Sequence, residues 1–269
     1  MKTEQIIYIK RNSTSFDLRS NLYQILLFKS EAKFSIDLVD YSVSSNHIVF
    51  LSPYQNFRLF EGLNVCALSF HADFYCIEYH KKEVACNGIL FNNIYETPYV
   101  YLSENEFLEI EHIFSKIDSL QDLTQSYDIS LKKTYLQLIL ALCSKQKLLS
   151  KAARSNFKND ELFDFKLLIE QHFTENRNIS FYAEQFHLTN DAFSKKVKSI
   201  YGKPPSILIK ERLILEAKKL LHLTYKNINE IAFELGFSDE FHFSKYFKNE
   251  VGISPKHYRD EVGISIVAK

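Results

Sequence analysis

The stretch Ala232-Phe-Glu-Leu-Gly-Phe-Ser-Asp-Glu-Phe-His-Phe-Ser-Lys245 decides the fold of the C-terminal part, because a close copy of it occurs earlier in the chain. The earlier copy begins Ala183-Glu-Gln-Phe-His-Leu-Thr-Asn and continues with Phe193-Ser-Lys195. The copies are offset by 49 residues before their turns and by 50 after them, so the second turn carries one extra residue. The shared positions that follow are Lys198, Gly202 and Pro205 in the first copy and Lys248, Gly252 and Pro255 in the second.

Each copy predicts a short helix, a tight turn and a second helix. Ala183 and Ala232 supply the small residue that two closely crossing helices need. Gly236 suits a left-handed turn, and His187 takes that position in the first copy. This is the pattern of a helix-turn-helix motif, whose second helix lies in the major groove of DNA. Two such motifs in tandem indicate a protein that reads two segments of one duplex.

The ends of the second helices carry their own signals. Gly202 and Gly252 end them, and the prolines that follow sit in the first turn of the next helix. A connecting helix of about 18 residues, from Pro205 to about His222, would span about 27 Å and hold the two reading helices near one turn of B-DNA apart, about 34 Å. The candidate N-caps are Thr189 or Asn190 in the first copy and Ser238 or Asp239 in the second.

Charge is distributed unevenly along a chain whose net charge is zero. The segment from Thr189 to Arg259 holds 11 lysines and 2 arginines against 6 glutamates and 2 aspartates, a net charge of +5. A locally basic stretch is a modest electrostatic signature of phosphate binding.

The first 100 residues predict strands, since short β-branched and aromatic stretches alternate with Asn, Ser, Pro and Gly. Many short strands at this spacing indicate a barrel or jelly roll. Near Tyr101 the period changes to that of helices, with Ser103 as a candidate cap. Residues 144–160 lose the apolar stripe and predict an interdomain linker. The expected strands are 23–28, 34–39, 47–51 and 65–70.

The expected helix from about Tyr127 has two apolar faces, so it must be buried on two sides. One face holds Leu136, Ile139, Leu140 and Cys143. The other can pack on a second subunit, or both can be covered within one chain. The dimerisation residues on the second face are Leu131, Tyr135, Leu138 and Leu142.

The residues 236–259, from Gly-Phe-Ser-Asp to His-Tyr-Arg, resemble the C-terminal signature of the AraC/XylS family of bacterial transcription regulators. The segment 211–221, with Glu211-Arg-Leu213 and Glu216-Ala-Lys-Lys-Leu-Leu221, resembles that family's connecting helix. The resemblance implies an α+β protein whose first half is a cupin-like β-barrel with a helical dimerisation segment. It implies double-stranded DNA and a second copy of the chain as partners, and leaves RNA polymerase and a small-molecule effector open. The expected domains are 1–100 (sensor barrel), 101–143 (dimerisation helices), 144–160 (linker), 161–262 (tandem helix-turn-helix) and 263–269 (tail).

The resemblance also implies which side chains face DNA. Lysine can reach guanine O6 or N7 and phenylalanine can contact a thymine methyl group. Asp191 can accept from cytosine N4 or serve only as a charge at the helix N-terminus. Family members often have Arg where this chain has Lys195 and Lys245, and lysine lacks the bidentate fork of arginine. The expected base-reading residues are Asp191, Ser194, Lys195, Glu240, Phe241, Ser244 and Lys245. The expected phosphate contacts are Thr189, Lys198, Lys248, Lys256 and Arg259.

Other classes find less support in the sequence. No apolar run is long enough to cross a membrane and no signal peptide opens the chain, so a cytoplasmic protein is expected. The histidines of the first half show no metal-ligand spacing, so no metal, cofactor or catalytic residue is expected. The alternative is a cupin-type ligand-binding protein or enzyme with an accessory helical domain. The candidates considered for its metal site are His47, His71, His80, Asp73 and Glu78.

Overall fold

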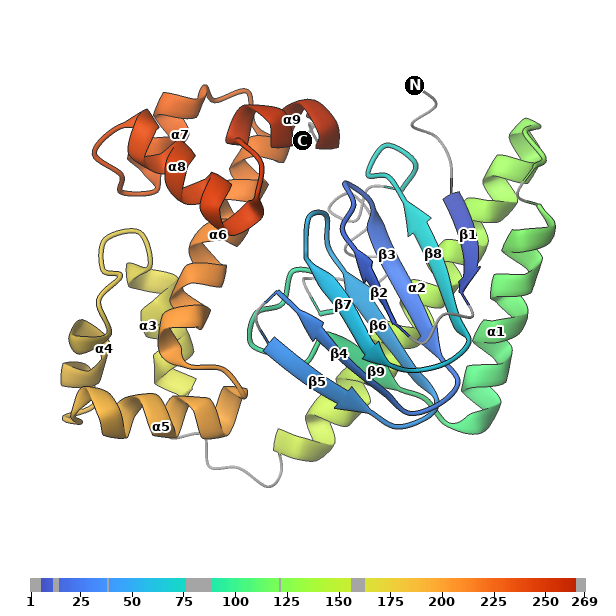
Figure 1. The fold of residues 1–269 in the computed structure, drawn as a ribbon, viewed down its shortest axis with the longest axis horizontal. Helices are drawn as coiled ribbons and strands as arrows, with labels where there is room; N and C mark the ends of the chain where they lie inside the picture. Colours follow the sequence, from blue (N-terminus) through green and yellow to red (C-terminus); the bar gives the residue numbers. More distant parts are fainter. Residues whose placement is uncertain are drawn as a thin grey trace. The chain divides into compact units, whose positions relative to one another are not determined.

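The computed structural model describes residues 6–11, 15–37, 39–75, 89–120, 122–155 and 163–264. Its contacts divide the chain into two units (Figure 1). Unit 1 comprises Met1–Asn93 and Thr97–Asn156, and unit 2 comprises Ile94–Glu96 and Phe157–Lys269. Both sheets belong to unit 1 and the tandem repeat belongs to unit 2, so the α+β fold class is confirmed.

Unit 1 contains two antiparallel sheets. The five-stranded sheet has the order β1-β8-β3-β6-β9 and the four-stranded sheet the order β2-β7-β4-β5. Among the described residues the strands therefore form two sheets and not one closed barrel. The strands are β1 (Ile6–Arg11), β2 (Phe16–Leu18), β3 (Tyr23–Phe28), β4 (Ala32–Ile36), β5 (Val39–Val43), β6 (His47–Leu51), β7 (Phe57–Glu61), β8 (Val65–Phe70) and β9 (Tyr99–Tyr101).

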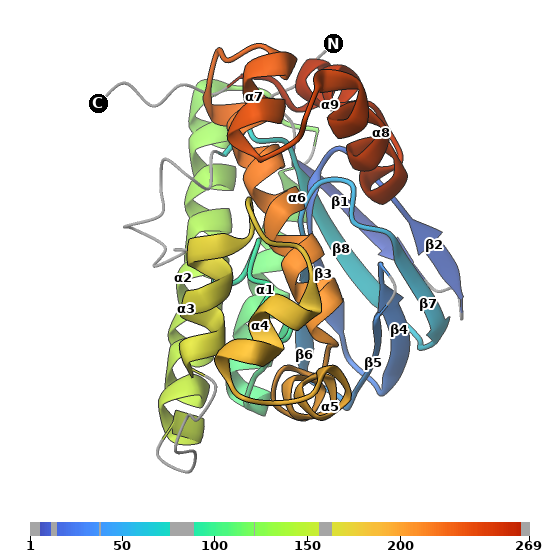
Figure 2. The same ribbon diagram turned by 90° about the vertical axis from the view of Figure 1, so that its left-hand side faces the viewer.

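The strands β3, β6 and β8 are buried on both faces. In β3, Leu26 and Phe28 pack toward the four-stranded sheet, while Ile25 and Leu27 pack toward two helices. This follows from the pleat, because successive side chains of a strand point to opposite faces. The five-stranded sheet is thus the middle of three layers, which Figure 2 shows between the helices and the other sheet. The expected strands 23–28, 47–51 and 65–70 are confirmed, and the expected strand 34–39 ends at Ile36.

The helical layer of unit 1 consists of α1 (Glu104–Ser119) and α2 (Ser126–Ser155). Ser103 is the N-cap of α1, as expected. The Glu106 carboxylate accepts hydrogen bonds from the Ser103 backbone N–H at 3.0 Å and from the Ser103 hydroxyl at 2.6 Å. α2 is 30 residues long and continues to Ser155, through most of the segment 144–160 that was expected to be a linker. Charged and polar residues replace the apolar stripe there, but Lys, Gln, Leu and Ala are all good helix formers.

Unit 2 is built around α6 (Pro205–Leu223), a helix of 19 residues and about 28 Å. The first motif, with α4 (Ile179–Gln185) and α5 (Asn190–Tyr201), lies at one end of α6 beside α3 (Phe163–His172). The second motif, with α7 (Ile228–Glu234), α8 (Glu240–Val251) and α9 (Pro255–Val262), lies at the other end (Figure 1). Ala183 and Ala232 are buried at the crossings, as expected.

Candidate nucleic-acid interface

The recognition helices α5 and α8 bury residues at equivalent positions of the sequence repeat. Phe193 and Val197 point inward from α5, and Phe243 and Phe247 occupy the equivalent buried positions in α8. The residues between them alternate between half-buried and exposed in the same order in both helices. Each helix therefore presents one matching outer face, as the sequence predicts.

The N-caps are Thr189 and Asp239, which selects one residue from each expected pair. The Thr189 hydroxyl accepts from the Ala192 N–H at 3.3 Å, and the Asp239 carboxylate accepts from the His242 N–H at 2.8 Å. This backbone hydrogen bond holds the pKa of Asp239 below its usual value. Each motif therefore begins its recognition helix with a satisfied backbone donor.

The helices end in the left-handed glycines that the sequence predicts. Gly202 has a φ of 72° and Gly252 a φ of 80°. Their N–H groups donate to the carbonyls of Lys198 and Lys248. The turn glycine Gly236 and its counterpart His187 are also left-handed, with φ of 73° and 53°. The two motifs thus have a left-handed residue at the same place in their turns, although the second turn is one residue longer.

Most of the residues expected to read bases lie on the outer faces. The Phe241 ring is 76% exposed, which places a large apolar surface in water at the start of α8. The exposed members of the expected set are Asp191, Lys195, Glu240, Phe241 and Lys245, and the half-buried members are Ser194 and Ser244.

Asp191 and Lys195 bind each other on the outer face of α5. Their carboxylate and ammonium groups lie 2.8 Å apart, and both side chains are 78% exposed. The hydrogen bond from Lys195 to Asp191 raises the pKa of the lysine. In the unbound protein Asp191 is thus a partner of Lys195 as well as an acidic residue in the first turn of α5.

Some lysines of unit 2 are paired with glutamates, whereas several exposed ones are not. Lys203 pairs with Glu211 at 2.9 Å, and Lys210 pairs with Glu250 at 3.1 Å. Within the residues that the structure describes, four exposed lysines of α5, α8 and α9 have no carboxylate within ion-pair distance. These exposed lysines are Lys198, Lys245, Lys248 and Lys256. The recognition helices and the start of α9 thus carry four exposed ammonium groups that have no carboxylate partner among the described residues.

Arg259, one of the expected phosphate contacts, also binds two backbone carbonyls. Its Nε donates to the Leu221 carbonyl at 3.0 Å and its Nη2 donates to the Lys226 carbonyl at 2.7 Å. Burial lowers the pKa of its guanidinium group. These bonds tie α9 to the end of α6. Thr189 remains at the interface edge, with its hydroxyl oxygen engaged as the cap of α5.

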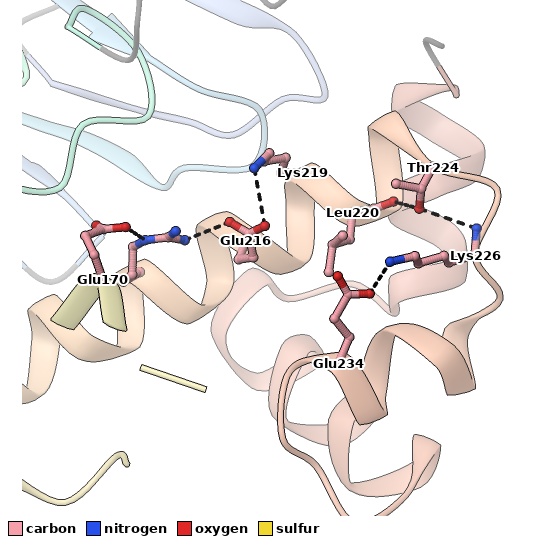
Figure 3. A network of polar contacts seen from close by, with 8 residues as sticks. Glu170, Glu216, Lys219, Leu220, Thr224, Lys226 and Glu234 are labelled. Atoms are coloured by element: carbon pink, nitrogen blue, oxygen red, sulfur yellow. Dashed lines mark hydrogen bonds and ion pairs between the residues drawn. The ribbon is translucent and has the colours of Figure 1, made fainter. Parts of the chain in front are cut away.

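An ion-pair chain fastens α3 to α6. Arg212 Nε donates to Glu170 at 2.8 Å, and Arg212 Nη1 donates to Glu216 at 2.9 Å. Figure 3 shows Glu216 continuing the chain to Lys219. Burial alone would lower the pKa of Arg212, but the bonds to the two glutamates outweigh it and raise this pKa. These ion pairs stabilise α6, the helix that connects the two motifs.

The expected set omitted three residues near α8. His242 and Asn249 are exposed on α8, and Arg177 precedes α4. With Lys245 they contribute to an open hollow of about 540 Å³ beside the turn of the second motif. Helical spacing is the signal for the first two, because residues three, four and seven apart share a face. The full lining is Arg177, Gly236, Phe237, Ser238, His242, Lys245, Tyr246 and Asn249.

The histidines considered for a metal site have local partners. His47 Nδ1 lies 3.0 Å from the carbonyl oxygens of Ser44 and Ser45, and His71 lies 3.2 Å from Asp73. In the described part of the chain no three His, Cys, Asp or Glu side chains converge on a common point. The other two candidates, His80 and Glu78, lie outside the described residues.

No helix among the described residues has the length and apolar character needed to cross a membrane.

Comparison with known proteins gives a match over the repeated region. A family model described as a helix-turn-helix domain matches residues 182–261. The transcriptional activator RhaS of Klebsiella pneumoniae (strain 342) is 24% identical over 151 residues, covering 56% of this chain and 53% of that protein. RhaS of Salmonella paratyphi B is 30% identical over 125 residues, covering 46% and 44%. This chain therefore spans about half the length of the curated relatives that it matches.

Among solved structures, ToxT from Vibrio cholerae aligns over 96% of this chain and 98% of its own, with 19% identity and a TM-score of 0.40.

Proposed function

We propose that this chain is a transcription regulator that binds specific double-stranded DNA sequences, because a family model described as a helix-turn-helix domain matches residues 182–261. The main support for the proposal is that α5 and α8 present matching outer faces. Both helices bury residues at equivalent positions, and both end at a left-handed glycine. Helices of this kind enter the major groove and contact base edges with the residues near their N-termini.

In this proposal some residues of the outer faces contact bases and others contact phosphates. Base edges are contacted by residues in the first two turns of each helix. These are Asp191, Ser194 and Lys195 of α5 and Glu240, Phe241, Ser244 and Lys245 of α8. Lys198 and Lys248 lie in the last turns and contact phosphates, with Lys256 at the start of α9 adding a third cation. The unpaired state of these three ammonium groups supports this, because each can bind a phosphate without first giving up a carboxylate.

We further propose that the chain acts as a homodimer through the outer face of α2. Leu136, Ile139 and Leu140 are fully buried against unit 1, while Leu131 is 43% and Leu138 is 41% exposed on the opposite side. The stripe continues through Tyr135 and Leu142, which are half-buried and already pack against the core of unit 1. A second copy of the same helix would bury it.

Unit 1 would then supply both the dimer contact and any response to a small-molecule effector. Contact with RNA polymerase would belong to the DNA-bound dimer. The division into a mixed sheet-and-helix unit and a DNA-reading unit supports this assignment.

The proposal is tested by measuring the affinity of the full chain for duplex DNA as a function of salt. We expect log K to fall linearly with log salt, and the slope to decrease by about 0.9 for each phosphate-bound lysine removed. Lys198→Ala and Lys248→Ala should each show this decrease. Lys33→Ala, in the exposed pair with Glu61 of unit 1, is the matched control and should leave the slope unchanged. Affinity that is independent of salt would refute the proposal.

A further inference from the structure

The loop between α3 and α4 contacts the turn of the second motif. Arg177 in this loop donates from Nη2 to the Leu235 carbonyl at 2.8 Å and to the Gly236 carbonyl at 3.2 Å. Its guanidinium carbon lies 3.9 Å from the centre of the Phe237 ring and 5.9 Å from that of Tyr246. One side chain from the first motif's side of unit 2 thus binds both the turn and the recognition helix of the second motif.

The turn is shaped for this contact. A Cβ atom at Gly236 would lie 2.2 Å from the Thr174 carbonyl oxygen, closer than any real contact. The loop and the turn therefore touch through their backbones, and only glycine permits that approach. This makes the position of the turn sensitive to the position of the loop.

The other end of the loop is anchored in the first motif. The hydroxyl of the fully buried Tyr182 on α4 donates to the Asn176 carbonyl at 2.8 Å. Asn178 caps α4 by accepting from the Ser180 N–H at 3.1 Å. The residues next to Arg177 on both sides are thus held by α4, so the arginine extends from a fixed point.

The charge of Arg177 has no carboxylate within ion-pair distance among the described residues. Burial lowers the pKa of its guanidinium group, so its desolvation is compensated only by carbonyls and aromatic faces. The strength of that arrangement depends on geometry, because a planar guanidinium must meet the carbonyls and the ring together.

We infer that Arg177 is a positioning residue that holds the second helix-turn-helix motif at one distance and angle from the first. The inference rests on the proposed function and adds a specificity rule to it. DNA would be bound tightly only when its two half-sites have one spacing, because the second helix cannot shift to reach a displaced half-site. The competing explanation is that α6 alone sets the spacing, in which case Arg177 has no effect on it.

The experiment measures how affinity depends on half-site spacing. Duplexes of about 40 base pairs, long enough for two half-sites about one helical turn apart, are selected from a random pool with the full-length wild-type chain. One or two base pairs are then inserted or deleted between the half-sites. The wild type, Arg177→Ala, Arg177→Lys and Lys226→Ala are compared on each duplex. Lys226→Ala is the matched control, because it removes one positive charge from the second motif, where Lys226 pairs with Glu234 at the surface.

We expect Arg177→Ala to lose about tenfold in affinity for the selected duplex, a typical size for coupling between two sites. On the altered spacings it should lose much less, so that its spacing profile is flatter than that of the wild type. Lys226→Ala should lower affinity by one factor at every spacing and keep the profile. Arg177→Lys retains the charge but not the planar group, so we expect a flattened profile with less overall loss.

A wild-type spacing profile in both Arg177 variants would overturn the inference, even if their affinity is lower at every spacing. A retained helical circular dichroism spectrum shows that a variant is folded. If Arg177→Ala is not folded, the spacing profile of Arg177→Lys alone tests the inference. A wild-type chain that selects no duplex would refute the proposed function itself, which is a different result from an unchanged profile.

Discussion

Gly236→Ala and Gly202→Ala form a matched pair of substitutions, because the two glycines have almost the same backbone conformation. Their φ angles are 73° and 72°. An added Cβ at Gly202 meets nothing within 4 Å, whereas at Gly236 it lies 2.2 Å from the Thr174 carbonyl oxygen. The difference between the two variants therefore isolates the contact between loop and turn.

The magnitude follows from the geometry. Placing alanine in the left-handed region costs about 1–2 kcal/mol at either position. At Gly236 the Thr174 carbonyl oxygen, 2.2 Å from the added Cβ, must also move by at least about 1.2 Å to reach an ordinary van der Waals distance. That movement weakens the hydrogen bonds of Arg177, and hydrogen bonds to charged groups contribute about 1.5–3 kcal/mol each. We expect Gly236→Ala to destabilise the second motif by about 2 kcal/mol more than Gly202→Ala destabilises the first.

Hydrogen–deuterium exchange read by mass spectrometry measures this, because peptides from α5 and α8 report on each motif in the full chain. A chain without tryptophan also makes this probe preferable to fluorescence. We expect exchange in α7 and α8 to rise about 30-fold more in Gly236→Ala than exchange in α5 rises in Gly202→Ala. Equal increases would show that Thr174 does not pack against the turn, and the reasoning would fail.

Three further predictions concern assembly, base reading and pH. Leu138→Ala should raise the dimer dissociation constant about 30-fold, because each copy loses about 1 kcal/mol of apolar burial and a twofold interface contains the residue twice. Sedimentation equilibrium measures this constant. An equal effect of Leu167→Ala, at an exposed leucine of unit 2, would show that α2 does not form the interface. Lys195→Ala and Lys245→Ala should each cost about 1–3 kcal/mol on the selected duplex and much less on a scrambled one, at two positions about one helical turn apart; equal losses on both duplexes would assign these lysines to phosphate. Burial raises the pKa of Tyr182 to about 12 from an ordinary value of 10.0, so the folded state favours the neutral phenol and the free energy of unfolding should fall as pH rises through this interval. Thermal melts of Tyr182→Phe should show a smaller fall, and parallel profiles for the two proteins would contradict the assignment.

Local signals in the sequence were sufficient for much of unit 2. The left-handed Gly202 and Gly252, the caps and the extent of α6 each depend on neighbouring residues, and all are observed. Arg177 and Arg259 could not be assigned in this way. Their partners are backbone carbonyls many residues away, and any residue type supplies a carbonyl.

In unit 1 the strands were easier to predict than their arrangement. The runs 23–28, 47–51 and 65–70 are apolar enough to identify, but continuous burial does not say which layer covers which face. The expectation of a linker at 144–160 relied on the loss of an apolar stripe. A helix can continue without one when its residues favour helix formation, and α2 does so to Ser155.

The middle position of the five-stranded sheet has a consequence for how the chain can be shortened. Both of its faces are apolar, so a fragment ending near residue 100 would leave Ile25, Leu27, Phe50 and Leu68 exposed to water. Exposed apolar strands with free backbone edges associate with one another. A fragment that extends to Ser155 retains both covering helices, so it should remain in solution during synthesis, whereas the shorter one should aggregate.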